Sequence, residues 1–192
     1  MELASVREQV LQECQRPGNV LGPSFFDQHV AVVADYGVQL AKYLGAEAEV
    51  VTLAAYLHDF SAIRDFTTLP QHAAVSADMA RDILVGHGYS SELIDSVVQA
   101  VETHSSPIQI GSGSLEEVCL SNADAIAQIV RPQYWCYFAF GIRRLSFDEG
   151  NKWLAERLSA NWASLIEPAR ELAREGYGKF RSYFDGQASP RN

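Results

Sequence analysis

Apolar residues recur every three or four positions along most of the chain, which is the spacing of one buried face of an α-helix. The longest example runs through Phe26, Val30, Val33, Gly37, Leu40 and Leu44. Ser24 predicts an N-cap for this helix and Gly45 predicts its end. Strand patterns are weak. The run VVTLAAYL has the β-branched content of a buried strand, but its Ala- and Glu-rich surroundings favour a helix.

Glycine and proline divide the pattern into successive helices. We expect the first six over residues 2–16, 24–44, 47–59, 70–85, 90–104 and 114–130. Pro132 interrupts the pattern, and two or three more helices fill residues 133–183. The sequence therefore predicts an all-α bundle of about eight or nine helices. It forms one domain over residues 1–184, followed by a loose tail at residues 185–192.

The amino-acid composition indicates the size of the domain and the cellular compartment in which it is expected. The chain has 192 residues, of which 47% are hydrophobic, enough for one domain with a substantial core. Its three cysteines are scattered and form no CxxC motif, which favours free thiols in a reducing compartment. No apolar run reaches the roughly 18 residues of a membrane span, and the acidic N-terminal segment is unlike a signal peptide. We expect a cytoplasmic protein with no membrane partner.

The formal net charge is −9, and lysine and arginine form no cluster. Both features argue against a nucleic acid polymer as a partner. The same negative charge would also repel a phosphate-bearing substrate unless a cation offsets it. Bound metal ions are one way to supply that cation.

Six side chains that can bind metals fall near the predicted buried faces of five successive helices. They are His29, His58, Asp59, His72, His104 and Asp124. Each histidine alone is compatible with a hydrogen-bonded core residue, but burying all six groups unpaired would cost on the order of several kcal/mol per ion. Divalent cations bind neutral imidazole together with ionised carboxylate. The fifth histidine, His87, lies between glycines and is expected at an exposed helix end.

This set of nitrogen and oxygen donors without a thiolate favours Fe, Mn, Zn, Ni or Co over a structural zinc site. Six groups are more than one tetrahedral ion needs, and they suit two ions that share a carboxylate. A single ion, with some of the six groups outside its coordination shell, is the alternative.

The segments that carry these six residues, taken in their order along the chain, resemble the HD-domain superfamily of metal-dependent phosphohydrolases. The superfamily pattern is His, then His-Asp, then Asp, with two further histidines in members that bind two metals. The resemblance covers residues 25–130 and leaves residues 131–184 as a helical extension. It is carried by FFDQHVAVVADYGVQLAKYLG, VVTLAAYLHDFS, QHAAVSADMARDILVGHGYS, VVQAVETHSS and SLEEVCLSNADAIAQI.

The resemblance implies a role for each candidate ligand. One metal would be bound by His29, His58, Asp59 and Asp124, and a second by His72, His104 and the bridging Asp59. His58 and Asp59 would be the central catalytic residues, with Fe or Mn the favoured metals. The metals would lower the pKa of a water molecule that attacks the phosphoryl group. A single-metal site, with His72 and His104 outside the coordination shell, remains open.

The chain departs from the family where the His-Asp pair is often followed by Ile-Gly-Lys. Here Phe60, Ser61 and Ala62 follow, so the lysine that can touch phosphate is missing. Arg64 and Arg131 are the candidates to replace it. Alternatively, Arg64 is an exposed charge that pairs with Asp65, and Arg131 lies at a solvated helix end.

The resemblance implies a hydrolase acting on a small-molecule phosphate monoester or phosphoanhydride, with a nucleotide as the first candidate. Two alternatives stay open: a di-iron oxygenase that cleaves a C–C or C–P bond, and a non-catalytic metal-bound sensor or partner-binding domain. In the extension, the aromatic segment QYWCYFAFGIRRLSF is either a wall against the substrate or a helix packed on the core. The amphipathic pair that follows it is compatible with a homodimer.

Overall fold

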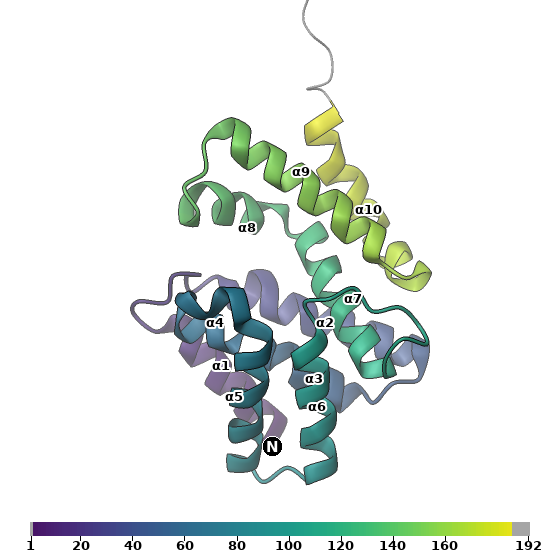
Figure 1. Ribbon diagram of the computed structural model, residues 1–192. Coiled ribbons are helices and arrows are strands. Elements are labelled where there is room, and N and C mark those ends of the chain that lie inside the picture. Colours follow the sequence, from purple (N-terminus) through teal and green to yellow (C-terminus); the bar gives the residue numbers. More distant parts are fainter. Residues whose placement is uncertain (1, 186–192) are drawn as a thin grey trace, which may run out of the picture.

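Residues 2–130 form a bundle of helices in the lower half of Figure 1. The computed structural model describes residues 2–185, and no strand occurs within that range. The all-α prediction is confirmed. The bundle consists of α1 (Glu2–Gln15), α2 (Ala31–Leu44), α3 (Ala48–Leu57), α4 (Phe60–Arg64), α5 (His72–Gly86), α6 (Ser91–Thr103) and α7 (Leu115–Val130).

Helix α7 is the central element because it packs against α2 and α6 in the bundle and against α9 and α10 beyond it. Its residues from Val118 to Ile129 are almost all buried. The helix begins with a capping box, in which Ser114 and Glu117 satisfy each other's backbone N–H groups. The Glu117 carboxylate also accepts a hydrogen bond from Thr103 Oγ1 at 3.0 Å, which ties α7 to α6.

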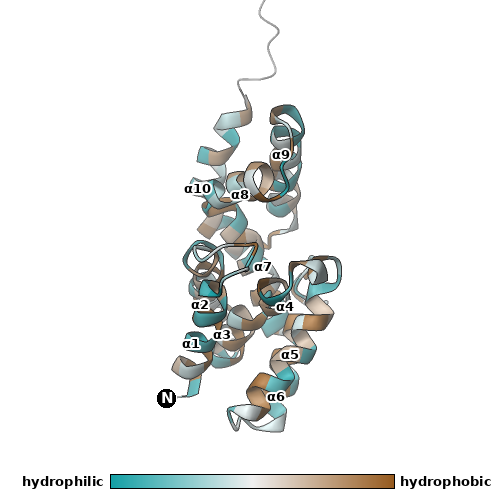
Figure 2. Ribbon diagram, turned by 90° about the vertical axis from the view of Figure 1, so that its left-hand side faces the viewer, coloured by the Kyte–Doolittle hydropathy of each residue, from teal (hydrophilic) through white to brown (hydrophobic). Residues whose placement is uncertain are grey.

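The extension forms a second layer on the far side of α7 (Figure 1). It contains α8 (Pro132–Tyr137), the π-helical turn η3 (Phe138–Ile142), α9 (Phe147–Ser164) and α10 (Glu167–Asp185). Pro132 occupies the first turn of α8, where its missing N–H costs nothing, so it restarts the helical chain after α7. Figure 2 shows α8, α9 and α10 gathered beyond α7 in a side view.

The regular α-helical geometry of the chain changes at three candidate ligands. A π-helical turn, η1 (Phe26–Val30), contains His29 and precedes α2. The predicted helix 47–59 corresponds to α3 and ends close to the expected residue, and Asp59 separates it from α4. A 3₁₀ turn, η2 (Phe66–Gln71), ends where α5 begins at His72. The apolar pattern continues through the π-helical turn, so sequence periodicity does not reveal it.

The helix ends were predicted with mixed success. Gly45 ends α2 in the left-handed conformation with φ of 78°, as expected. The Ser24 N-cap was wrong, because the chain enters η1 through Phe25 in helical geometry with no side-chain cap. Within the described range, every helix is too short or too polar to cross a membrane. Residues 186–192 of the predicted tail lie outside the described residues.

Candidate metal centre

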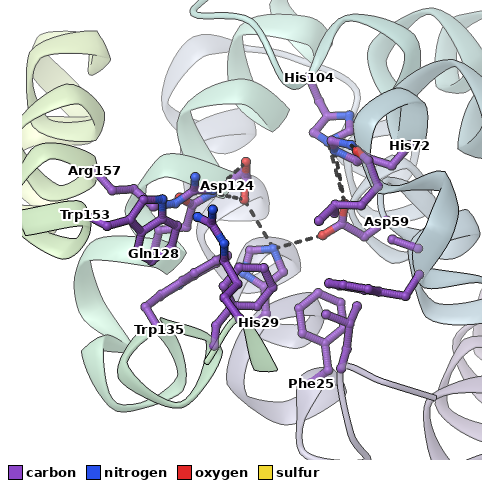
Figure 3. Close-up of a pocket in the computed structure, with 16 residues that line it drawn as sticks. Phe25, His29, Asp59, His72, His104, Asp124, Gln128, Trp135, Trp153 and Arg157 are labelled. Carbon is purple, nitrogen blue, oxygen red and sulfur yellow. Dashed lines mark hydrogen bonds and ion pairs between the residues drawn. The ribbon is translucent and has the colours of Figure 1, made fainter. Parts of the chain in front are cut away.

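The two carboxylate oxygens of Asp59 face two separate pairs of histidines. Figure 3 shows His29 on one side of Asp59 and His72 and His104 on the other. Asp59 Oδ2 lies 3.5 Å from His29 Nε2 and 3.2 Å from His58 Nε2. Asp59 Oδ1 lies 3.4 Å from His72 Nε2 and 3.9 Å from His104 Nε2. The break between α3 and α4 places this carboxylate between the two pairs. This is the arrangement that a carboxylate needs in order to bridge two cations.

The first group of ligands is deeply buried. His29 comes from η1, His58 from the end of α3 and Asp124 from α7. His29 Nε2 lies 3.1 Å from His58 Nε2 and 3.2 Å from Asp124 Oδ1. The side chains of His29 and His58 are 1% and 0% exposed. With Asp59, these residues offer two imidazole nitrogens and two carboxylates at one point.

The second group is more open. His72 at the start of α5 and His104 at the end of α6 bring their Nε2 atoms to 3.2 Å from each other. The His72 side chain is 21% exposed, whereas that of His104 is 1% exposed. The second group therefore lies nearer to solvent than the first.

Hydrogen bonds fix the tautomers of three of these histidines. Nδ1 of His58, His72 and His104 lies 2.7, 2.8 and 2.6 Å from the backbone carbonyl oxygen three residues earlier. A carbonyl only accepts, so Nδ1 carries the proton and a neutral ring turns the lone pair of Nε2 toward the cluster. In the second group, two lone pairs then face each other at 3.2 Å. A cation between them would turn this repulsion into coordination, and ligating histidines typically have such a partner on the other nitrogen.

His29 is positioned differently. Its buried Nδ1 has no hydrogen-bond partner among the described residues. The ring stacks on Phe25 with centroids 4.9 Å apart and meets the edge of Trp135 at 5.6 Å. The π-turn and these two aromatic rings therefore set its orientation.

Electrostatics place Asp59, Asp124 and His104 in the states that a metal requires. Burial raises the pKa of Asp59, but His58 and His29 outweigh burial and hold this pKa well below its usual value. Burial likewise opposes ionisation of Asp124, and His29 outweighs it to lower that pKa. Burial and the nearby His58 lower the pKa of His104 to about 4. Near neutral pH both carboxylates are ionised and His104 is neutral, as in a metal-bound cluster.

Two histidines carry the opposite shift. Burial lowers the pKa of His58, but Asp59 outweighs burial and raises this pKa. Burial lowers the pKa of His29, but Asp124 and Asp59 outweigh burial and raise this pKa to about 9. Without a metal, His29 is therefore the cation that the two carboxylates hold near neutral pH. A metal that binds there takes the place of this proton.

A cavity of about 390 Å³ lies over the cluster. Its floor contains His29, Asp59, His72, His104 and Asp124. The rest of the lining forms the wall, which is largely apolar, aromatic and cationic and comes from both layers of the fold: Leu21, Phe25, Ala62, Phe66, Leu69, Gln128, Trp135, Phe138, Arg143, Trp153 and Arg157. The aromatic segment of the extension thus packs on the core and also lines the cavity.

A chain of hydrogen bonds joins this wall to the floor. Gln128 Nε2 donates to both Asp124 oxygens, at 2.9 and 3.0 Å. Gln128 Oε1 accepts from Arg157 Nε at 2.7 Å and from Asn161 Nδ2 at 2.9 Å. Figure 3 shows Arg157 and Gln128 on the same side of the cavity as Asp124. Sequence reasoning missed both residues. The available signal was that Gln128 follows Asp124 by four positions, on the same face of the helix.

Neither arginine predicted to contact substrate lines this cavity. Arg64 is half exposed at the end of α4, with Nε 3.6 Å from Glu13 Oε1, a residue distant in sequence. Arg131 is exposed at the end of α7. His87 caps the end of α5, as predicted, and its Nε2 lies 3.0 Å from Gln9 Oε1 and outside the ligand cluster.

Comparison with protein families identifies the fold and the ligand pattern together. The HD domain model matches residues 26–129, which is more than half of the chain and includes all six candidate ligands. The chain belongs to the HD-domain family. An HD domain implies binding of a divalent metal, and the donors around Asp59 have the composition and geometry for it.

The HD-type fold extends beyond the matched residues. A solved structure described as a predicted HD superfamily hydrolase from an uncultured Thermotogales bacterium is similar, with a TM-score of 0.63 and 20% sequence identity. The similarity covers 97% of this HD protein and 92% of the other chain, so the shared fold includes the extension after α7. Comparison with curated proteins finds no match.

Proposed function

We propose that this HD protein is a metal-dependent phosphohydrolase with two divalent transition metals, cleaving a phosphate monoester or phosphoanhydride of a small molecule. The observation that carries the proposal is Asp59, whose two oxygens face two different pairs of histidines at the floor of a cavity. Fe or Mn is favoured, and Zn, Ni and Co suit the same donors.

Each part of the chain has a role in this proposal. His29, His58 and Asp124 would hold one metal, His72 and His104 the other, and Asp59 would bridge the two. Such a pair of metals supplies an activated water and neutralises phosphoryl oxygens. Gln128 holds both oxygens of Asp124, which limits rotation of that carboxylate. Phe25 and Trp135 enclose His29 and keep bulk water away from the buried group.

The charge of the chain supports metals in this role. A net charge of −9 opposes the approach of a phosphate, and the floor adds two ionised carboxylates. Two divalent cations would reverse the sign of the floor and attract the phosphoryl group. This reversal at the cavity would make an acidic protein compatible with an anionic substrate.

The test begins with metal analysis of protein purified without oxygen. It continues with a screen for phosphate release from nucleotides, sugar phosphates and inorganic pyrophosphate with each candidate metal. We expect about two metals per chain and phosphate release that requires them. Fewer than one metal per chain would overturn the dinuclear site. Oxygen uptake without phosphate release would instead favour a di-iron oxygenase, and metal binding with neither reaction would favour a sensor.

A further inference from the structure

Two arginines line the cavity without a carboxylate partner. Arg143 follows η3 and Arg157 lies in α9. Neither forms an ion pair with a carboxylate in the part of the chain that the structure describes. By contrast, Arg81 and Arg174 on the outer surface each pair with an acidic residue. In a protein with excess negative charge, two unpaired guanidinium groups at one cavity need an explanation.

The Arg157 side chain is held in place, and some of its hydrogen-bond donors remain unused. Its Nε donates to Gln128, and its guanidinium lies 4.7 Å from the ring centroid of Trp135 and 5.2 Å from that of Trp153. The two terminal nitrogens make no hydrogen bond to any residue in the described range. Arginine presents its donors in a planar fork that matches phosphate oxygens. A fixed guanidinium with a free fork is therefore preorganised for an oxyanion.

Arg143 approaches the same aromatic surface from a different element. Its guanidinium lies 5.3 Å from the Trp153 ring, so both cations contact one indole. Burial lowers the pKa of Arg157, Asp124 and Asp59 oppose that shift, and the charge of Arg143 lowers this pKa further. The two guanidinium groups thus repel each other across the wall. An anion bound between them would remove this repulsion.

We propose that Arg143 and Arg157 form an anion subsite for a second phosphate group, which makes a phosphoanhydride the substrate class rather than an isolated monoester. This inference rests on the proposed function for the metal floor. The floor would receive the phosphoryl group that is attacked. The arginines on the wall would receive the neighbouring phosphate, which leaves.

The bond changes account for the need for a second cationic site. The oxygen of water forms a bond to the phosphorus at the floor, and the bond from that phosphorus to the bridging oxygen breaks. The electron pair stays on the bridging oxygen, which leaves with the second phosphate. With inorganic pyrophosphate, the two protons of water end on the two products, as two hydrogen phosphate ions. Guanidinium groups placed at the leaving phosphate stabilise the charge that develops there.

The alternative is that the arginines only pack against Trp135 and Trp153. The two explanations predict different relative affinities for a probe with one anionic group and a probe with two. We suggest calorimetric titration of the metal-loaded protein, without excess metal, with methylenediphosphonate and with methylphosphonate. Both probes resist hydrolysis, and quenching of tryptophan fluorescence gives a second readout beside Trp153.

We expect methylenediphosphonate to bind at least about tenfold more tightly than methylphosphonate, as a charged hydrogen-bonded pair provides. Arg143→Gln and Arg157→Gln should each remove about tenfold of the affinity for methylenediphosphonate and leave that for methylphosphonate within about twofold. Arg157→Lys, which keeps the charge but not the fork, should lose an intermediate amount. Arg144→Gln is the matched control, since Arg144 is the exposed neighbour that does not line the cavity.

Equal affinity for the two probes, or equal losses for both in the variants, would overturn the subsite. The exposed position of Arg143 means that its substitution does not threaten folding, so a variant without effect counts against the proposal. Failure of the metal floor has a different signature. In that case methylphosphonate would not bind to the wild type, and adding metal would change neither titration.

Discussion

The floor and the wall of the cavity are built on opposite principles. The floor gathers ligands from His29 to Asp124, contributed by five segments of the bundle, and its carboxylates lie 3.2 to 3.9 Å from imidazole nitrogens. The wall has its cations and tryptophans within residues 135–157, and its two cations have no acidic partner in the described chain. The charged groups of the floor are thus paired within the protein before any substrate arrives. The two arginines of the wall, by contrast, are available to an anionic substrate. We infer that the floor sets the chemistry and the wall sets which molecule is accepted.

The largest expected effect comes from removing the bridge in the floor. Asp59→Ala deletes the only side chain among the described residues that contacts both histidine pairs. We expect both metals to be lost and kcat/KM to fall by well over the roughly 100-fold that loss of an outer partner costs. Metal analysis and phosphate release measure the two effects.

The control for this change is Asp35→Ala, an exposed aspartate on α2. It should keep wild-type metal content and rate. Activity of Asp59→Ala near that of the wild type would exclude Asp59 as the bridge and, with it, the distinction between floor and wall.

The next effect separates the two groups within the floor. His72→Ala removes a ligand from the more open group, so we expect about one metal per chain to remain, in the buried group. His29→Ala removes a buried ligand and should reduce occupancy of the first group instead. Metal content of His72→Ala equal to that of the wild type would favour the single-metal site. His87→Ala, at the far end of α5, should leave metal content unchanged.

A smaller effect tests the connection between wall and floor. Gln128→Leu removes the hydrogen bonds that orient Asp124 but leaves every ligand in place. We expect metal affinity to fall by roughly 10- to 100-fold, as for other partners of metal ligands. Competition with a chelator measures this affinity. Asn161→Ala, which removes a hydrogen bond to Gln128 and none to Asp124, should cost less. Equal losses in both variants would show that Gln128 acts only through packing.

The smallest expected effect concerns stability of α7, the helix that floor and wall share. Burial raises the pKa of Glu117, but hydrogen bonds from Ser114, Gln99 and Thr103 outweigh it and lower this pKa. A lowered pKa in the folded state stabilises the protein above the pKa of the unfolded chain, and this contribution is lost as pH falls through the folded-state value. We expect Glu117→Gln to unfold about 1 kcal/mol more easily at pH 7 and like the wild type at acidic pH. Chemical denaturation at both pH values measures this difference. If Glu117→Gln is still less stable than the wild type at acidic pH, the charge of Glu117 does not account for the difference in stability.

The contrast between floor and wall also explains what the sequence could reveal. Histidine and aspartate are costly to bury, so His29, His58 and Asp124 on apolar faces are conspicuous, and the helical pattern orders them correctly. Arg157 and Trp153 belong to residue types that commonly cover surfaces and cores, so nothing in their spacing distinguishes a wall from ordinary packing.

The local geometry of the site was hidden for a related reason. The π-turn at His29 lies inside a stretch whose apolar spacing continues as in a helix. Arg64 was a reasonable candidate by its position after the His-Asp pair, but its charge meets Glu13 from α1. That contact depends on how distant elements pack, which local sequence does not specify.

Helix α7 carries a consequence for how this protein can change during evolution. Asp124 belongs to the floor, and Gln128, one turn later, accepts a hydrogen bond from Arg157 of the wall. One residue inserted between them would rotate the second relative to the first by about 100° and separate the two halves of the cavity. Substitutions can retune the wall one side chain at a time, but insertions and deletions within this turn would be eliminated. New specificities would therefore arise through changes in side chains and in the loops around α9, with the length of α7 held constant.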